Sequence, residues 1–98
     1  MKYYLCKYMP PRAEFLQTMS ADEKTWMAQH GVFLDSLLAQ GIIVAHGPVM
    51  DPAGGYGVSL YRIADDQQIE QLTAQDPIVR NGAGHYEHYP MLHLKARD

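Results

Sequence analysis

The sequence predicts an α+β fold in which a four-stranded antiparallel sheet carries two helices on one face, in the order β-α-β-β-α-β. Three observations support this prediction. One apolar stripe repeats at helical spacing between residues 20 and 41. Four other segments have the tyrosine and β-branched content of strands, and glycine- and proline-rich turns separate the elements. The length of 98 residues fits a single domain over residues 1–98.

The first strand is predicted over Lys2–Met9, which is rich in tyrosine and is followed by Pro10-Pro11. Cys6 in this segment is the only cysteine, so the chain can form no internal disulfide. A small buried sheet residue is a simpler interpretation of Cys6 than a reactive thiol. A reducing compartment is consistent with this cysteine usage, and we expect a cytoplasmic location.

The first helix is predicted to begin after Ser20, because Ser20 and Glu23 have the spacing of a capping box. Gly41 is predicted to end it as a C-terminal cap. Between them, side chains at three- and four-residue steps form one stripe, which consists of Trp26, His30, Phe33, Leu34, Leu37 and Leu38. His30 therefore points toward the same side as the apolar residues.

A hairpin is predicted next. Ile42–Ala45 is its first strand, which Gly47-Pro48 is expected to break, and Tyr56–Ile63 is its second. The intervening Asp51–Gly55 has turn chemistry. Gly54–Gly57 precedes a strand rather than a helix, so we interpret it as a turn and not as a phosphate-binding loop.

The second helix is predicted to be capped by Asp65 or Asp66 and to stop at Pro77, with Ile69 and Leu72 on its buried face. The last strand is predicted over residues 85–94, where a proline indicates an edge position or a bulge.

The resulting order is that of the ferredoxin-like plait. Its second sheet face has no helix to cover it. A chain of this length also buries only about 60–65% of its unfolded surface, so a homodimer is expected.

Charge and hydropathy exclude two classes of partner. The formal net charge is −3, and the eight lysines and arginines are scattered along the chain. Nucleic acid is therefore not an expected partner. No apolar run approaches the ~20 residues of a membrane span, and the N-terminus lacks the apolar core of a signal peptide.

Two polar residues are the candidates for chemistry. His30 lies on an apolar helix face, where a core histidine with a hydrogen-bond partner is the structural alternative to a catalyst. Asp76 follows Ile69 and Leu72 at helical spacing, and its structural alternative is a cap for the turn that begins at Pro77. If both side chains face the sheet they can meet, and the aspartate would orient the imidazole for acid–base catalysis.

Further candidates are weaker. His46, Gly47 and Pro48 could line a ligand cleft beside His30, with a simple turn as the alternative. Tyr86 is a further candidate for ligand contact. Three other histidines, at 85, 88 and 93, do not converge along a strand, so no metal site is predicted.

These residues resemble the pattern of the YCII-related family. The resemblance rests on the opening strand Tyr3–Tyr8, on His30, on a series of glycine turns and on the Asp76-Pro77 pair; the remaining pieces are Gly41, Gly47-Pro48, Gly54-Gly55 and Gly84 with Tyr86-Glu87-His88. Ile78 stands where the family more usually has an aromatic residue, and residues 10–19 match no motif. Both departures leave the substrate open.

The resemblance implies a dimeric α/β barrel in which the sheets of two subunits stack, and a His–Asp active site at His30 and Asp76. It also implies acid–base chemistry on a small cyclic or aromatic molecule, of the lyase, dehydrochlorinase or isomerase type. No cofactor is expected. The alternatives are a non-catalytic ligand-binding or accessory domain with a structural His–Asp pair, and a haem- or quinone-related monooxygenase.

Overall fold

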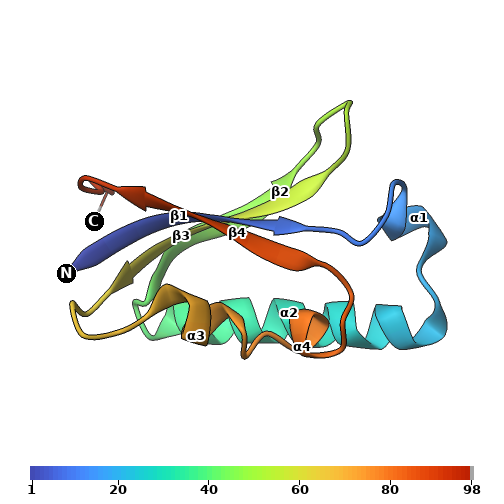
Figure 1. The fold of residues 1–98 in the computed structure, drawn as a ribbon, viewed down its shortest axis with the longest axis horizontal. Helices are drawn as coiled ribbons and strands as arrows, with labels where there is room; N and C mark the ends of the chain where they lie inside the picture. The colour runs from blue at the N-terminus through green and yellow to red at the C-terminus, as the bar shows by residue number, and fades with distance from the viewer. Residues whose placement is uncertain (98) are drawn as a thin grey trace.

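The computed structural model describes residues 1–97 and has two layers, a four-stranded antiparallel sheet and a layer of helices (Figure 1). The elements follow in the order β1 (Lys2–Met9), α1 (Phe15–Thr18), α2 (Ala21–Ala39), β2 (Ile43–Val49), β3 (Tyr56–Ile63), α3 (Ile69–Thr73), α4 (Pro77–Arg80) and β4 (His85–Met91). The strands lie side by side as β2-β3-β1-β4. The predicted plait is confirmed, with the second helix divided into α3 and α4.

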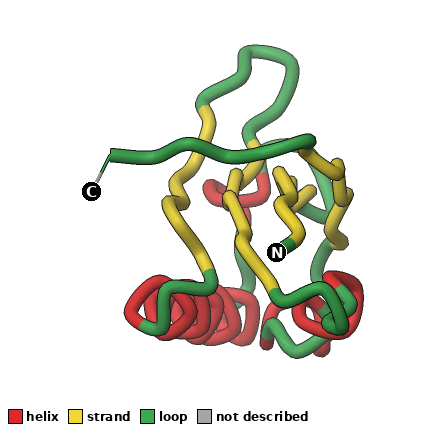
Figure 2. The backbone as a smooth tube through the Cα atoms, turned by 90° about the vertical axis from the view of Figure 1, so that its left-hand side faces the viewer, coloured by secondary structure: helices red, strands yellow, loops and turns green. Residues whose placement is uncertain are grey.

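The helices α2, α3 and α4 lie on one side of the sheet, as the end-on view shows (Figure 2). Cys6 and Tyr8 of β1 face these helices and are buried. Because side chains alternate along a strand, Leu5 and Lys7 face the other way. We call this second side the open face; its central residues are Leu5, Lys7, Val58, Leu60 and Tyr89.

Helix α2 forms as predicted. The Ser20 hydroxyl accepts a hydrogen bond from the Glu23 amide at 3.1 Å, and the Glu23 carboxylate accepts one from the Ser20 amide at 2.8 Å. The buried residues of the helix are His30, Leu34 and Leu37. The apolar stripe is therefore narrower than its sequence pattern, since Leu38 is 42% exposed.

Strand β2 is longer than predicted. It continues through Gly47 and Pro48 to Val49, so the expected break at this glycine–proline pair is wrong. The strand order explains why, because β2 lies at one edge of the sheet and an edge strand tolerates a proline that lacks an amide hydrogen. Pro90 in β4 occupies the opposite edge, as its position in the sequence indicated.

The second helix begins later than predicted. The residue before α3 is Gln68, so capping by Asp65 or Asp66 is wrong. Asp65 instead pairs with the N-terminal ammonium at 2.8 Å, and residues 64–67 form a turn. The last strand ends at Met91 rather than at Leu94.

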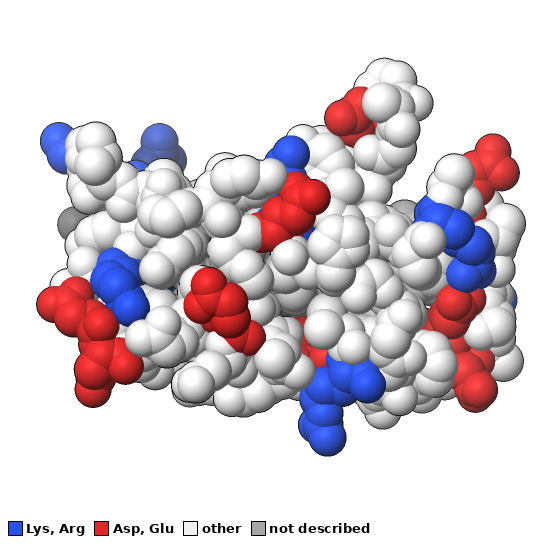
Figure 3. Space-filling model, in the orientation of Figure 1, with Lys and Arg blue, Asp and Glu red and all other residues white. Residues whose placement is uncertain are grey.

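Acidic and basic side chains are interspersed on the face that the space-filling view presents (Figure 3). Among residues 1–97, no helix is long and apolar enough to cross a membrane.

Candidate functional site

The centre of the candidate site is a hydrogen bond between two helices. Nδ1 of His30 lies 2.6 Å from Oδ2 of Asp76. His30 projects from the buried face of α2, and Asp76 is the fully buried N-cap of α4. A carboxylate oxygen can only accept, so Nδ1 of His30 carries the proton and Nε2 is the nitrogen left for other chemistry.

Asp76 is held by three donors. Its Oδ1 accepts from the Ile78 amide at 3.1 Å, and its Oδ2 accepts from both His30 and the hydroxyl of Tyr86, the latter at 2.6 Å. These bonds offset the cost of burying a carboxylate. The sequence offers Asp76 a capping role and a contact with His30, and the structure shows both. The predicted position of Asp76 on the same helix as Ile69 is wrong, because α3 ends at Thr73.

Aromatic rings enclose the pair on the sheet side. The Tyr8 ring centroid is 5.1 Å from that of His30 and 5.8 Å from that of Tyr86. Burial, followed by the charge of Asp76, raises the pKa of both tyrosines well above the usual range. Both hydroxyls therefore stay protonated and act as donors, Tyr8 to the Ala83 carbonyl at 2.5 Å and Tyr86 to Asp76.

Gly84 brings β4 close enough for this arrangement. Its φ is +104°, and a Cβ built on it would lie 2.5 Å from the carbonyl oxygen of Met9. Only glycine fits so close an approach with this backbone conformation. The start of β4 can therefore lie against the end of β1, which places Tyr86 opposite Tyr8 in the sheet register.

Nε2 of His30 makes no hydrogen bond to residues 1–97. Within that range, the Tyr61 hydroxyl is the one side-chain polar group that is both sealed from solvent and unpartnered. Nε2 of His30 therefore keeps some contact with solvent, although the whole residue is only 7% exposed.

Two surface hollows lie elsewhere, and His30 lines neither. The first is a groove of about 690 Å³ between α2 and the α3–α4 segment. Its lining includes Gln29 and Pro77, which are next to His30 and Asp76 in the sequence. The second, of about 610 Å³, lies between the end of α2, β2 and the C-terminal tail.

The predicted ligand contacts divide between two places. Tyr86 lies in the site, although its hydroxyl is engaged by Asp76. His46, Gly47 and Pro48 lie on β2, which β3 separates from β1, and Nε2 of His46 is 2.9 Å from Oδ1 of Asp35. A ligand-binding role for these residues stays a prediction.

Other reactive side chains have structural partners. Nε2 of His88 is 2.8 Å from the Thr73 hydroxyl, and burial lowers the pKa of this histidine. Burial, and then the charge of Glu70, raises the pKa of the Cys6 thiol to about 12, which fits an inert buried residue. No three potential ligands among residues 1–97 gather into a metal-binding group.

This geometry defines a small α+β protein that holds an imidazole–carboxylate pair between its sheet and its helices. The chain belongs to the YCII-related domain family, whose profile matches residues 1–95. The family predicted from the sequence motifs is therefore confirmed. None of the curated proteins matches this sequence.

The fold resembles those of several solved structures, including two enzymes. One is 5-chloro-2-hydroxyhydroquinone dehydrochlorinase (TftG) from Burkholderia phenoliruptrix AC1100 in complex with 2,5-dihydroxybenzoquinone, at 17% identity and a TM-score of 0.64, over 97% of this chain and 99% of that chain. The other is SnoaB, a cofactor-independent oxygenase from Streptomyces nogalater, at 13% identity and a TM-score of 0.49, over 97% and 94%. At such identity, the likeness to the dehydrochlorinase establishes the fold.

Proposed function

We propose that this protein is a cofactor-independent enzyme that performs acid–base chemistry on a small cyclic or aromatic molecule, as a lyase, a dehydrochlorinase or an isomerase. His30 is the group that moves the proton, and Asp76 orients it. The observation that carries the proposal is the 2.6 Å bond from Nδ1 of His30 to a buried carboxylate, with Nε2 still in contact with solvent.

The bond to Asp76 determines which nitrogen can react. With Nδ1–H donated to the carboxylate, the neutral imidazole presents a lone pair at Nε2, which can accept a proton from a ring hydroxyl or an acidic C–H group. In a dehydrochlorination the base takes a proton from the substrate, the electron pair of that bond forms the new double bond of the product, and chloride leaves with the electron pair of the C–Cl bond, so the net loss is HCl. The imidazolium is stabilised by Asp76 and then returns its proton to solvent.

The dehydrochlorinase neighbour supplies the test compounds. Chloride release from 5-chloro-2-hydroxyhydroquinone is measured for the wild type, for His30→Asn and for His85→Asn, the last being an exposed control. We expect His30→Asn to lose about 10²–10⁴-fold in rate, the usual contribution of a general base. The control should keep the wild-type rate. Equal rates in all three proteins would contradict the proposal.

The second candidate is a non-catalytic ligand-binding or accessory domain with a structural His–Asp pair. It is favoured by the low exposure of His30 and by the position of both hollows away from it. NMR separates the two candidates. A His30 ring that titrates with pH, and whose titration changes on addition of 2,5-dihydroxybenzoquinone, supports the enzyme, and a ring that responds to neither ligand nor pH supports the structural pair.

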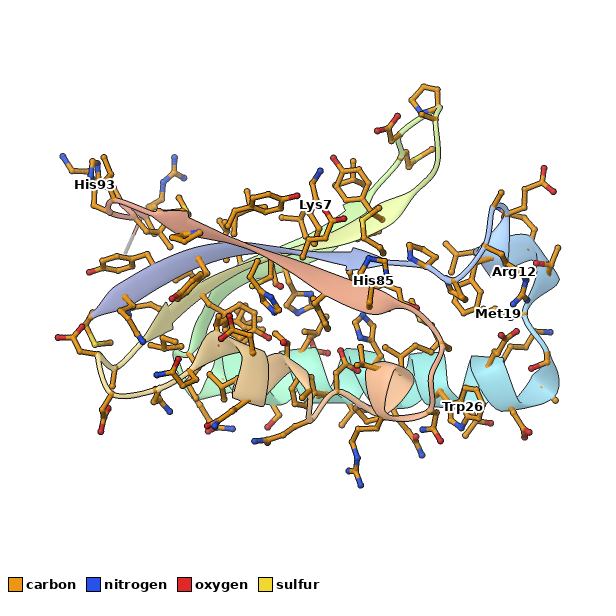
Figure 4. All side chains as sticks on the ribbon, viewed as in Figure 1. Lys7, Arg12, Met19, Trp26, His85 and His93 are labelled. Carbon is orange, nitrogen blue, oxygen red and sulfur yellow. The ribbon has the colours of Figure 1, made fainter. Side chains whose placement is uncertain are left out.

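We propose further that the protein is a homodimer that buries the open face. Leu5 and Leu60 lie opposite each other there, and among residues 1–97 no helix lies over this side of the sheet (Figure 2). Figure 4 shows Lys7 on this side of the sheet and Trp26 in the helix layer. Sedimentation equilibrium at the mass of one chain would exclude the dimer. The cytoplasmic location stays a prediction.

A further inference from the structure

We propose that Tyr86 is a positioning residue for His30, because its hydroxyl shares one oxygen of Asp76 with the imidazole and so sets how strongly that oxygen holds the imidazole proton. Any effect of Tyr86 on turnover rests on the proposed function. Its effect on the hydrogen bond between His30 and Asp76 is a property of the ligand-free protein.

The geometry puts two donors in competition. Nδ1 of His30 and the Tyr86 hydroxyl both lie 2.6 Å from Oδ2 of Asp76. The other oxygen, Oδ1, is engaged by the Ile78 amide at 3.1 Å. Hydrogen bonds to a carboxylate are charge-assisted, and each donor draws electron density from the oxygen that it shares. The bond from Tyr86 therefore weakens the attraction of Oδ2 for the proton on His30.

The surroundings fix the Tyr86 ring in this position. It packs edge-on against Tyr8 and stacks on His88 at a centroid distance of 6.2 Å. The titratable groups that face the His30–Asp76 pair are Tyr8 from β1 and Tyr86 from β4, while Cys6 and Tyr61 lie further along the same buried layer. Among them, Tyr86 donates to the same oxygen as His30.

Tyr8 provides a matched control. Both tyrosines pack close to His30 or its partner, and each has one hydroxyl hydrogen bond. The Tyr8 hydroxyl donates to the Ala83 carbonyl at 2.5 Å, whereas that of Tyr86 donates to Asp76. Replacing either by phenylalanine keeps the ring and removes only the hydroxyl, so a difference between the two variants reports on the shared carboxylate oxygen.

The test follows the Nδ1 proton of His30 in the low-field region of the proton NMR spectrum, assigned by its absence from His30→Asn protein. A stronger hydrogen bond moves such a proton downfield. We expect a downfield shift in Tyr86→Phe and the wild-type position in Tyr8→Phe. An unchanged, upfield-shifted or lost resonance in folded Tyr86→Phe protein overturns the inference.

A measurement on the wild type covers the case in which Tyr86→Phe does not fold. In a mixture of light and heavy water, the Tyr86 hydroxyl carries either hydrogen or deuterium. If the two donors share Oδ2, the Nδ1 proton resonance of His30 splits or shifts with that isotope, and a single unshifted line overturns the inference. Neither readout depends on a substrate, so failure of the chloride-release assay would count against the proposed function alone.

Discussion

Helix α2 contributes one residue to each of two histidine–aspartate pairs, and the pairs differ in burial and in the distance between their members. His30 and Asp76 are joined at 2.6 Å, with side chains 9% and 0% exposed. His46 and Asp35 are joined at 2.9 Å, with side chains 20% and 71% exposed. The same two residue types therefore occur once as an interior bond between layers and once as a surface contact.

The difference shows that burial, rather than residue type, gives such a pair its role. A surface pair competes with water and is worth about 0–1 kcal/mol. A buried carboxylate without donors costs several times more, so its partners are required by the fold. Asp76 has three partners in the interior, whereas Asp35 lies largely in solvent.

The largest expected effect comes from removing each aspartate in turn. Asp76→Ala deletes the α4 cap and leaves His30 and Tyr86 without their acceptor, so we expect a loss of about 4 kcal/mol in unfolding free energy. Asp35→Ala should change it by less than about 0.5 kcal/mol. Urea unfolding followed by circular dichroism measures both. Similar losses for the two variants would show that burial does not separate the pairs.

Much of the buried pair could be predicted from local patterns. The spacing from Trp26 and Phe33 predicts that His30 points inward. The position before Pro77 predicts the capping role of Asp76, whereas its spacing from Ile69 and Leu72 assumed a helix that in fact ends at Thr73. The hydroxyl of Tyr86 as a third member could not be predicted in this way. The contact depends on how β4 pairs with β1 in the sheet, and these two strands are far apart in the sequence. Gly84, two residues before Tyr86, is the one feature of the local sequence that indicates a close approach of β4 to β1.

The errors in the predicted fold have a similar origin. Pro48 was expected to break its strand, but the edge position of β2 removes the requirement for its missing amide hydrogen. Asp65 was expected to cap a helix, but the N-terminal ammonium takes its carboxylate. In both cases the place of the segment in the folded protein, rather than its local preference, decided the outcome. Helix α2, whose capping box is entirely local, was predicted correctly.

The second comparison is between Gly84, which lies against Tyr8 and Met9 near the buried pair, and Gly47 beside the surface pair. Gly84→Ala forces a Cβ to within 2.5 Å of the Met9 carbonyl at a φ of +104°, and we expect a loss of about 3 kcal/mol. Gly47 adjoins His46, has an ordinary backbone conformation and has nothing within 4 Å of its added Cβ. Gly47→Ala should therefore be nearly neutral. Thermal unfolding checks both, and a neutral Gly84→Ala would contradict the close approach of β4 to β1.

The smallest expected effect concerns two tyrosines that share the buried layer with Asp76. Tyr86 donates to the carboxylate, whereas the Tyr61 hydroxyl is fully buried and makes no hydrogen bond within residues 1–97. Burial, with Cys6 and Asp76 nearby, raises the pKa of Tyr61, and the hydroxyl of the neighbouring Ser59 offsets only part of this rise, so the Tyr61 hydroxyl remains a neutral group in the interior. The contact with Ser59 does not have the geometry of a hydrogen bond.

Tyr86→Phe removes a hydrogen bond to a charged group and should lower the unfolding free energy by about 2 kcal/mol. Tyr61→Phe removes a hydroxyl that has lost its water without gaining a protein partner, so it should be neutral or slightly stabilising, by less than about 1 kcal/mol. Paired urea titrations test this ranking. If Tyr61→Phe proves the more harmful of the two, the Tyr61 hydroxyl makes a buried hydrogen bond in solution, and the hydroxyl of Ser59 on the same strand is the candidate partner.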